Sequence, residues 1–190
     1  SYDVYAGCLL HIERELVHLA IPVRSSFTSS ISQLLLFLIF FPVIVEGPIS
    51  RYDQLGSQLY EGHKFDYYKF TSGLQLIVWG LFKKMVIADR IDGFVSVIFG
   101  SYGDYGGLAV ALAILLYTIQ LYTEFSGCMD IVTGCARLFG ISLAKNFEQP
   151  FFSRNVNEFW RRWHITLGAF LRDYVFYPIS LSKFFQKLSK

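Results

Sequence analysis

The chain has 190 residues, of which 53% are hydrophobic and 18% aromatic, and its formal net charge is +2. This apolar share exceeds that of an ordinary soluble domain, so the composition predicts a membrane protein. Its basic and acidic residues are interleaved, which excludes a nucleic-acid-binding protein. The three cysteines form no Cys-x-x-Cys pair and no histidine has the spacing of a ligand set, so no metal site is expected.

From the N-terminus, residues 1–23 mix apolar and charged side chains, which predicts an amphipathic helix at the membrane interface. The first predicted membrane span follows, from Ser25 to Val45, and Pro42 predicts a kink or local unwinding near its far end. The second predicted span runs from Tyr105 to Thr123. Both segments lack charged residues and are close to the roughly 20 residues that cross a bilayer.

Between these spans, Phe70 to Phe82 is apolar but short, and Lys83-Lys84 interrupts it. This pattern predicts either a helix that ends at an interface or a bent helix packed within protein. After the second span, Ser126-Gly127 is expected to break the helix. A last helix is expected to begin near Asn155 or Asn157, since either side chain can cap it.

The segment Asn146 to Pro178, NFEQPFFSRNVNEFWRRWHITLGAFLRDYVFYP, gathers arginines, two tryptophans and a histidine. Near apolar segments each buried charge or imidazole costs several kcal/mol unless it is paired or faces water. A helical wheel at 100° per residue places Trp160, Trp163 and His164 on one apolar face. From the residues alone, a histidine there is more often a hydrogen-bonded structural residue than a functional one.

The charged candidates each have two interpretations. Arg161 and Arg162 can be interfacial side chains, with Glu158 and Arg162 as an ordinary surface pair, or they can bind an acidic acyl carrier or the phosphates of a thioester donor. Glu124 and Asp130 need a cation, water or protein neighbour, so a structural pair with an arginine and a role in a substrate channel both stay open.

Three blocks in this order carry a resemblance: FFPVIVEGPISRYDQL (Phe40 to Leu55), LYTEFSGCMDIVTG (Leu121 to Gly134), and EFWRRWHITL followed by LRDYVFYP. Together they resemble the membrane-bound O-acyltransferase family, in particular its bacterial branch that acetylates polysaccharides or alanylates teichoic acid. The middle block departs from the usual pattern, because Glu124 stands where aspartate is common and Cys128-Met129 replaces a Tyr-Ser pair.

The resemblance implies an all-α, multi-pass transmembrane protein with kinked, tilted and interfacial helices. It also implies that residues 1–190 are a single partial domain of the family, lacking its N-terminus and C-terminal part. A second histidine, regarded as the catalytic one in the family, is expected outside this chain. We therefore expect the chain alone to be inactive.

The implied activity is transfer of an acyl group from a thioester donor, acetyl-CoA or an acyl carrier, to a hydroxyl of an exported or cell-surface polysaccharide. Acetyl is favoured because EFWRRWHITL and GLFKKMVIADRI look closer to the alginate-acetylating members. D-alanyl transfer to teichoic acid is the alternative, and a non-enzymatic transporter or scaffold subunit is another.

The expected place is the bacterial plasma membrane, and the expected partners are the bilayer, the polysaccharide acceptor, an acyl carrier protein and other export or acetylation proteins. No bound cofactor is expected. His164 is implied to be catalytic, by accepting the proton of the acceptor hydroxyl. The implied substrate-binding residues are Arg161, Arg162, Trp163, Asn146, Glu124 and Asp130.

Overall fold

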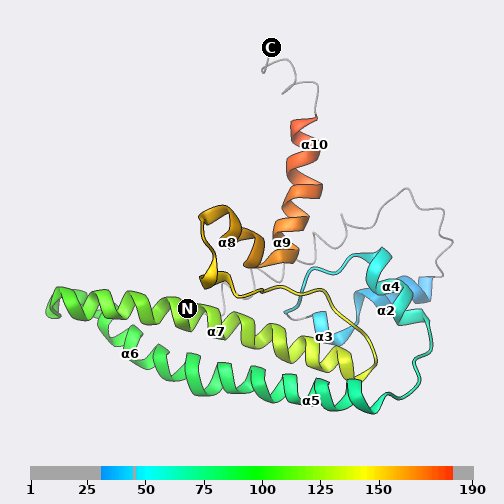
Figure 1. Ribbon diagram of the computed structural model, residues 1–190, viewed down its shortest axis with the longest axis horizontal. Coiled ribbons are helices and arrows are strands. Elements are labelled where there is room, and N and C mark those ends of the chain that lie inside the picture. The colour runs from blue at the N-terminus through cyan, green and yellow to red at the C-terminus, as the bar shows by residue number, and fades with distance from the viewer. Residues whose placement is uncertain (1–30, 45, 182–190) are drawn as a thin grey trace. The chain divides into compact units, whose positions relative to one another are not determined.

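The structure, a computed structural model, describes residues 31–44 and 46–181 (Figure 1). The regular elements among these residues are helices. Phe147 and Trp163 also form an isolated antiparallel β-bridge. The predicted all-α class is therefore confirmed. The interfacial helix expected at residues 1–23 lies outside the described residues. Contacts divide the chain into two compact units, Ser1–Gly62 with Leu143–Lys190, and His63–Ser142.

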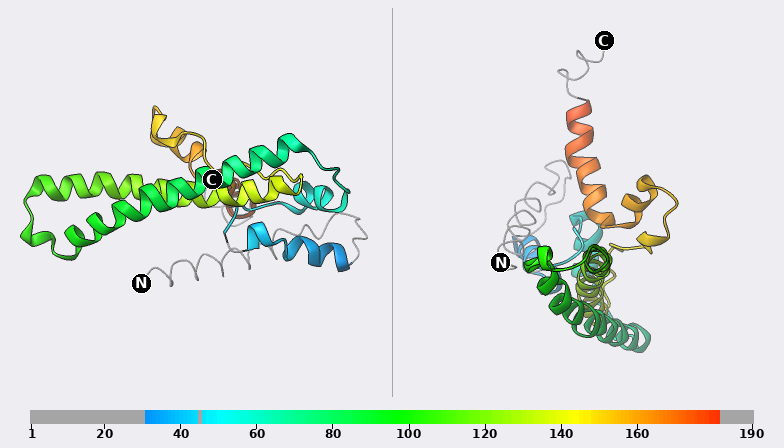
Figure 2. Two further views of the ribbon diagram at one scale, coloured as in Figure 1. Left: turned by 90° about the horizontal axis from the view of Figure 1, so that it is seen from below. Right: turned by 90° about the vertical axis from the view of Figure 1, so that its left-hand side faces the viewer.

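The unit His63–Ser142 is a helical hairpin, with its two arms side by side in both views (Figures 1 and 2). Its first arm combines α5 (Tyr67–Leu81), a π-helical turn η1 (Phe82–Ala88) and α6 (Asp89–Gly100). After a 3-10 turn, η2 (Tyr102–Asp104), the second arm is α7 (Gly107–Leu138). The arms have 34 and 32 residues, and both are long and apolar enough to cross a membrane.

Two predicted helix boundaries in the hairpin differ from the observed ones. The predicted span Tyr105 to Thr123 lies almost entirely within α7, but the expected break at Ser126-Gly127 is wrong, because α7 continues to Leu138. In the first arm, Lys83-Lys84 falls in η1 instead of ending a helix. The helix therefore does not end at the lysines, since a π-turn inserts one residue without stopping the helix. The apolar stretch of this arm is mostly not buried, so the expected packing within protein is not seen in the part of the chain that the structure describes.

Glycines bring the two arms of the hairpin into contact. Gly73 and Gly80 lie seven residues apart in α5, as Gly127 and Gly134 do in α7, so each pair shares one helix face. A Cβ atom added at Gly80 would lie 2.5 Å from the carbonyl oxygen of Gly127, and one added at Gly134 would lie 2.7 Å from that of Gly73. Backbones this close leave no space for a side chain. Gly127 therefore serves helix packing instead of breaking the helix.

The hairpin ends in a glycine cap. Gly140 has φ 79°, and its N–H donates to the Arg137 carbonyl at 2.9 Å while the Ile141 N–H donates to the Ala136 carbonyl at 3.1 Å. These two bonds form a Schellman motif, which satisfies carbonyls left over at the end of α7. Lys69 of α5 donates to the Gly140 carbonyl at 3.0 Å. The turn thereby ties the start of the first arm to the end of the second.

Lysine–carboxylate pairs cross between the arms near η1. Lys83 Nζ lies 2.6 Å from Asp130 Oδ2 and Lys84 Nζ lies 2.7 Å from Glu124 Oε1, and both of these pairs join the two arms. Lys84 Nζ also lies 2.9 Å from Asp89 Oδ1 on its own arm. The Lys83 and Asp130 side chains are 13% and 24% exposed, so this pair is largely shielded from solvent. Glu124 and Asp130 do have cationic partners, as their apolar setting required, but these are lysines and not arginines.

The pair between Lys83 and Asp130 gives a stability prediction. Asp130→Asn is expected to lower the unfolding midpoint in detergent, at a cost of up to about 3 kcal/mol, because it leaves a shielded ammonium without its counter-charge. The double variant Lys83→Met with Asp130→Leu is expected to recover most of that loss. The measurement is thermal unfolding of the purified protein, and a double variant less stable than Asp130→Asn would contradict the prediction.

The other unit contains short helices. Its described N-terminal part holds α2 (Ile31–Leu38), α3 (Phe41–Ile44) and α4 (Tyr52–Tyr60). The predicted span Ser25 to Val45 is thus interrupted at Ile39-Phe40, just before α3. The predicted local unwinding near Pro42 is therefore confirmed. Pro42 itself lies in the first turn of α3, where its missing N–H costs nothing.

The C-terminal part of this unit follows a loop and a 3-10 turn, η3 (Pro150–Phe152). Asn155 caps α8 (Val156–Arg162) by accepting the Glu158 N–H at 2.8 Å, which confirms the first of the two predicted helix starts. Beyond α8 the backbone breaks and then continues as one helical stretch (Figure 1). This stretch comprises α9 (Ile165–Phe170), the π-helical η4 (Leu171–Phe176) and α10 (Tyr177–Ser180).

Candidate functional site

His164 lies in the break between α8 and α9. It adopts a left-handed backbone conformation with φ 47° and ψ 54°, so the helix that begins at Asn155 stops before it. The helical-wheel placement of Trp160, Trp163 and His164 on one continuous face is therefore wrong. Non-glycine residues are uncommon in this conformation, although histidine is among those that tolerate it best. Such local strain persists where surrounding contacts hold it, and it gathers at functional sites.

A short antiparallel pairing holds this break in place. The Ile165 N–H donates to the Asn146 carbonyl at 2.9 Å, and the Glu148 N–H donates to the Arg162 carbonyl at 2.9 Å. Between these two bonds, Trp163 pairs with Phe147 across the bridge, and their rings meet edge to face with centroids 5.1 Å apart. The loop before η3 thus fixes the backbone on both sides of His164.

The side chain of Asn146 connects to His164 directly. Asn146 is buried, and its Oδ1 lies 3.0 Å from His164 Nδ1, 3.2 Å from the Thr166 backbone nitrogen and 2.9 Å from Thr166 Oγ1. A backbone N–H can only donate, so the amide atom facing Thr166 is the oxygen. An oxygen accepts, and His164 Nδ1 must therefore carry the proton. The lone pair of the imidazole then lies on Nε2, the tautomer a general base requires.

Burial also sets the charge of this imidazole. It lowers the pKa of His164 from 6.5 to about 4, because the charged form loses solvation. At neutral pH the ring is therefore uncharged and able to accept a proton. Its burial makes the neutral form the one compatible with the folded site.

A pH profile tests this charge state. If neutral His164 is required for turnover, kcat/KM is expected to stay level from pH 7 to about 5 and to fall by half near pH 4, where the lowered pKa lies. The same shift predicts that stability is full above pH 6.5 and declines toward pH 4. An acidic limb near the ordinary histidine value of 6.5 would contradict the assignment.

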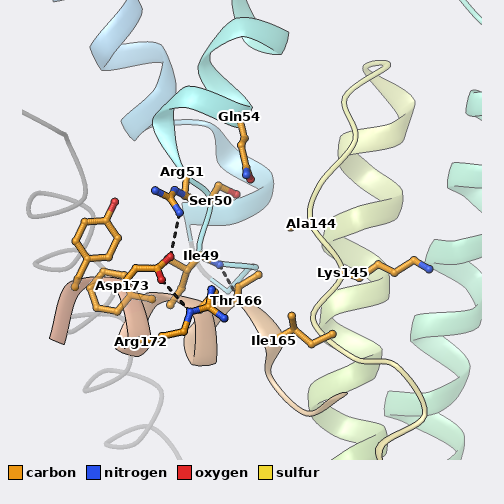
Figure 3. Close-up of a pocket in the computed structure, with 13 residues that line it drawn as sticks. Ile49, Ser50, Arg51, Gln54, Ala144, Lys145, Ile165, Thr166, Arg172 and Asp173 are labelled. Atoms are coloured by element: carbon orange, nitrogen blue, oxygen red, sulfur yellow. Dashed lines mark hydrogen bonds and ion pairs between the residues drawn. The ribbon is translucent and has the colours of Figure 1, made fainter. Parts of the chain in front are cut away.

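A cavity of about 270 Å³ adjoins the residues that follow His164 (Figure 3). Its polar wall is organised by Asp173, whose Oδ2 lies 3.2 Å from Arg51 Nη1 and whose Oδ1 lies 3.0 Å from Arg172 Nε. The guanidinium of Arg51 also lies 5.9 Å from the ring centre of Tyr174. The cavity thus offers hydrogen-bond donors and acceptors next to an aromatic ring. Its lining includes Ile49, Ser50, Arg51, Gln54, Ile165, Thr166, Arg172, Asp173 and Tyr174.

The residues expected at the site divide between the two units. Asn146, Trp163 and His164 are brought together by the antiparallel pairing. Arg162 Nη2 forms the expected pair with Glu158 at 2.6 Å, and Arg161 is exposed on α8. Glu124 and Asp130 belong to the hairpin and pair with its lysines. A substrate-binding role for these charged residues stays a prediction.

Sequence reasoning missed Thr166, Arg51 and Asp173. Thr166 lies two residues after His164, within the same block, and this proximity was the available signal. Arg51 and Asp173 are 122 residues apart in sequence, so no local pattern connects them. Across residues 31–44 and 46–181, no group of three or more histidine, cysteine or acidic side chains could hold a metal ion.

Several known proteins are similar to this chain in sequence, and their names agree with the family suggested by its three sequence blocks. A peptidoglycan O-acetyltransferase of Helicobacter pylori is 36% identical over 146 residues, covering 76% of this chain and 28% of that protein. A Pseudomonas aeruginosa protein named probable alginate O-acetylase is 38% identical over 141 residues. The aligned region covers 74% of this chain and 26% of the Pseudomonas protein. A teichoic acid D-alanyltransferase of Bacillus subtilis is 31% identical over 146 residues, covering 76% of this chain and 37% of that enzyme.

The chain thus spans between 26% and 37% of the length of these three relatives. Residues 5–189 of this chain match the family description of the membrane-bound O-acyltransferases. The three blocks, the paired helices able to cross a membrane and the site around His164 all fall within the matched residues. The chain belongs to the membrane-bound O-acyltransferase family.

Proposed function

We propose that the protein containing this chain moves an acetyl group from a thioester donor to a hydroxyl of an exported or cell-surface polysaccharide, with His164 as its base. The observation that carries the proposal is the Asn146–His164 contact of 3.0 Å, which places the proton on Nδ1 and the lone pair on Nε2. The names of the relatives support the acyl class, since two are O-acetyltransferases or O-acetylases and one is a D-alanyltransferase.

The proposed chemistry uses the neutral imidazole. His164 Nε2 takes the proton of the acceptor hydroxyl while that oxygen attacks the thioester carbonyl, forming a tetrahedral intermediate. When the C–S bond breaks, the imidazolium returns the proton to the departing sulfur. An ester and a free thiol result, and His164 is neutral again. Because its pKa is lowered to about 4, the imidazolium readily gives up the proton it has taken.

The cavity next to Thr166 suits the acceptor. A sugar presents hydroxyls that both donate and accept, and the wall offers the Asp173 carboxylate, the Arg172 guanidinium and the Gln54 amide (Figure 3). The ring of Tyr174 adds an apolar surface for a sugar face. We therefore place the polysaccharide unit in this cavity, with its reacting hydroxyl toward His164.

We further propose a multi-pass protein of the bacterial plasma membrane, supplied by acetyl-CoA or by an acyl carrier protein and acting with other export or acetylation proteins. The two arms of the hairpin support a membrane location, because each exceeds the roughly 20 residues needed to cross the hydrocarbon. A thioester donor made inside the cell and a polymer outside it require such a location.

The test of this function supplies purified full-length protein with labelled acetyl or D-alanyl thioester, on CoA or on a carrier, and an exported polysaccharide. Acetyl esters that accumulate on the polymer in a hydroxylamine-sensitive form are the expected result. Transfer of D-alanyl alone would replace the acetyl proposal with alanylation. Movement of polymer across vesicles without ester formation would instead support the transporter alternative.

A further inference from the structure

Thr166 is buried beside His164, and its hydroxyl has a defined direction. The Ile49 N–H points at Thr166 Oγ1 with a distance of 3.1 Å, so the hydroxyl oxygen accepts there (Figure 3). The hydroxyl hydrogen is then free to donate to Asn146 Oδ1 at 2.9 Å. The hydroxyl thus relays a backbone donor onto the amide of Asn146.

The hydroxyl and the backbone N–H of Thr166 together hold the oxygen of the Asn146 amide toward His164. Asn146 Oδ1 receives the Thr166 hydroxyl and the Thr166 N–H, at 2.9 and 3.2 Å. If the amide turned over, its NH₂ group would meet the Thr166 N–H donor to donor, and it would present a donor to His164 Nδ1. The imidazole would then need its proton on Nε2 and would lose the lone pair used in the proposed reaction.

We propose that Thr166 is a positioning residue, which holds the Asn146 amide so that His164 keeps its proton on Nδ1. The inference rests on the proposed function for its catalytic consequence, but the tautomer itself is a property of the resting protein. In this role Thr166 acts through Asn146, although its side chain also lines the cavity proposed for the acceptor. Ile49, on the loop before α4, completes the arrangement by orienting the hydroxyl.

The test compares three variants of the full-length protein in detergent. Thr166→Val keeps the shape but removes the hydroxyl, and Thr166→Ser restores it. Thr123→Val is the matched control, because Thr123 is equally buried but its hydroxyl bonds only to carbonyls of its own helix, at 2.8 and 3.1 Å. If Thr166→Val does not fold, Thr166→Ala takes its place.

The first readout is the ring tautomer. Nitrogen-15 shifts of labelled histidine are expected to show His164 with its proton on Nδ1 in the wild type, and the His164→Asn spectrum identifies which signals belong to His164. In Thr166→Val a population with the proton on Nε2 is expected to appear, and Thr166→Ser should restore the wild-type shifts. Unchanged shifts in Thr166→Val would overturn the proposal, even if its unfolding midpoint falls.

The second readout is kinetic. Thr166→Val is expected to lower kcat about tenfold, the value of one net hydrogen bond, and to leave KM within about twofold. Thr166→Ser and Thr123→Val should stay near wild type. A tautomer that responds to Thr166 while His164→Asn remains fully active would preserve the positioning result and overturn only the proposed base. A change that appears in KM while kcat stays at the wild-type value would overturn the positioning role. An equally large kcat loss in Thr123→Val would overturn it too.

Discussion

Replacing His164 with asparagine is expected to lower acyl transfer by about 100- to 10,000-fold, the usual contribution of a positioned general base. The asparagine amide can still donate to Asn146 Oδ1, which now lies 3.0 Å from His164 Nδ1, and asparagine tolerates the left-handed backbone that this position requires. Fold and local hydrogen bonding are thus retained, and only the proton-accepting nitrogen is lost. The measurement is the rate of ester formation on the polysaccharide, with donor and acceptor both saturating.

His164→Gly provides the matched control for folding. Glycine adopts φ 47° without steric cost, so this variant is expected to unfold at or above the wild-type temperature while it is as inactive as His164→Asn. Stability and activity then change independently. Wild-type rates in either variant would remove His164 from the reaction, and an inactive but misfolded His164→Gly would show that the ring is needed for structure.

The local sequence predicted those features of the fold that depend on nearby residues. The cap at Asn155, the pair between Glu158 and Arg162 and the long apolar stretch of α7 follow from side chains within a few turns. The break at His164 does not, because it depends on a pairing with the loop at Asn146, 18 residues earlier. A wheel drawn on one helix assumes a continuous backbone, and no local signal in WRRWHITL contradicts that assumption.

The glycine at position 127 also shows that local sequence does not predict contacts with distant residues. Ser126-Gly127 has the composition of a helix break, and from one helix alone that is the ordinary interpretation. The structure instead places Gly127 against Gly80, 47 residues earlier, where any side chain would collide with backbone. Lysine partners for Glu124 and Asp130 were missed for the same reason, since they belong to the opposite arm. Helix propensity can be read from a short stretch of sequence, but contacts between residues far apart in sequence cannot.

Gly80→Ala is expected to destabilise the hairpin by about 1 to 3 kcal/mol, as overpacking does at a close contact. Its added Cβ would lie 2.5 Å from the Gly127 carbonyl oxygen, 2.7 Å from Ile131 Cγ1 and 3.0 Å from the Ile131 nitrogen. Two of these three atoms belong to the backbone, so rotating a side chain cannot relieve the clash. The arms must move apart, which weakens contacts along both helices.

Gly93→Ala is the control with the opposite expected sign. Gly93 is also inside a helix of the first arm, but nothing lies within 4 Å of a Cβ added there. Alanine should therefore leave stability unchanged or raise it by up to about 1 kcal/mol, through its better helix propensity. Unfolding in detergent, followed by circular dichroism, measures both variants. Equal stability changes at Gly80 and Gly93 would contradict the close glycine contact, because helix propensity alone would then account for both substitutions.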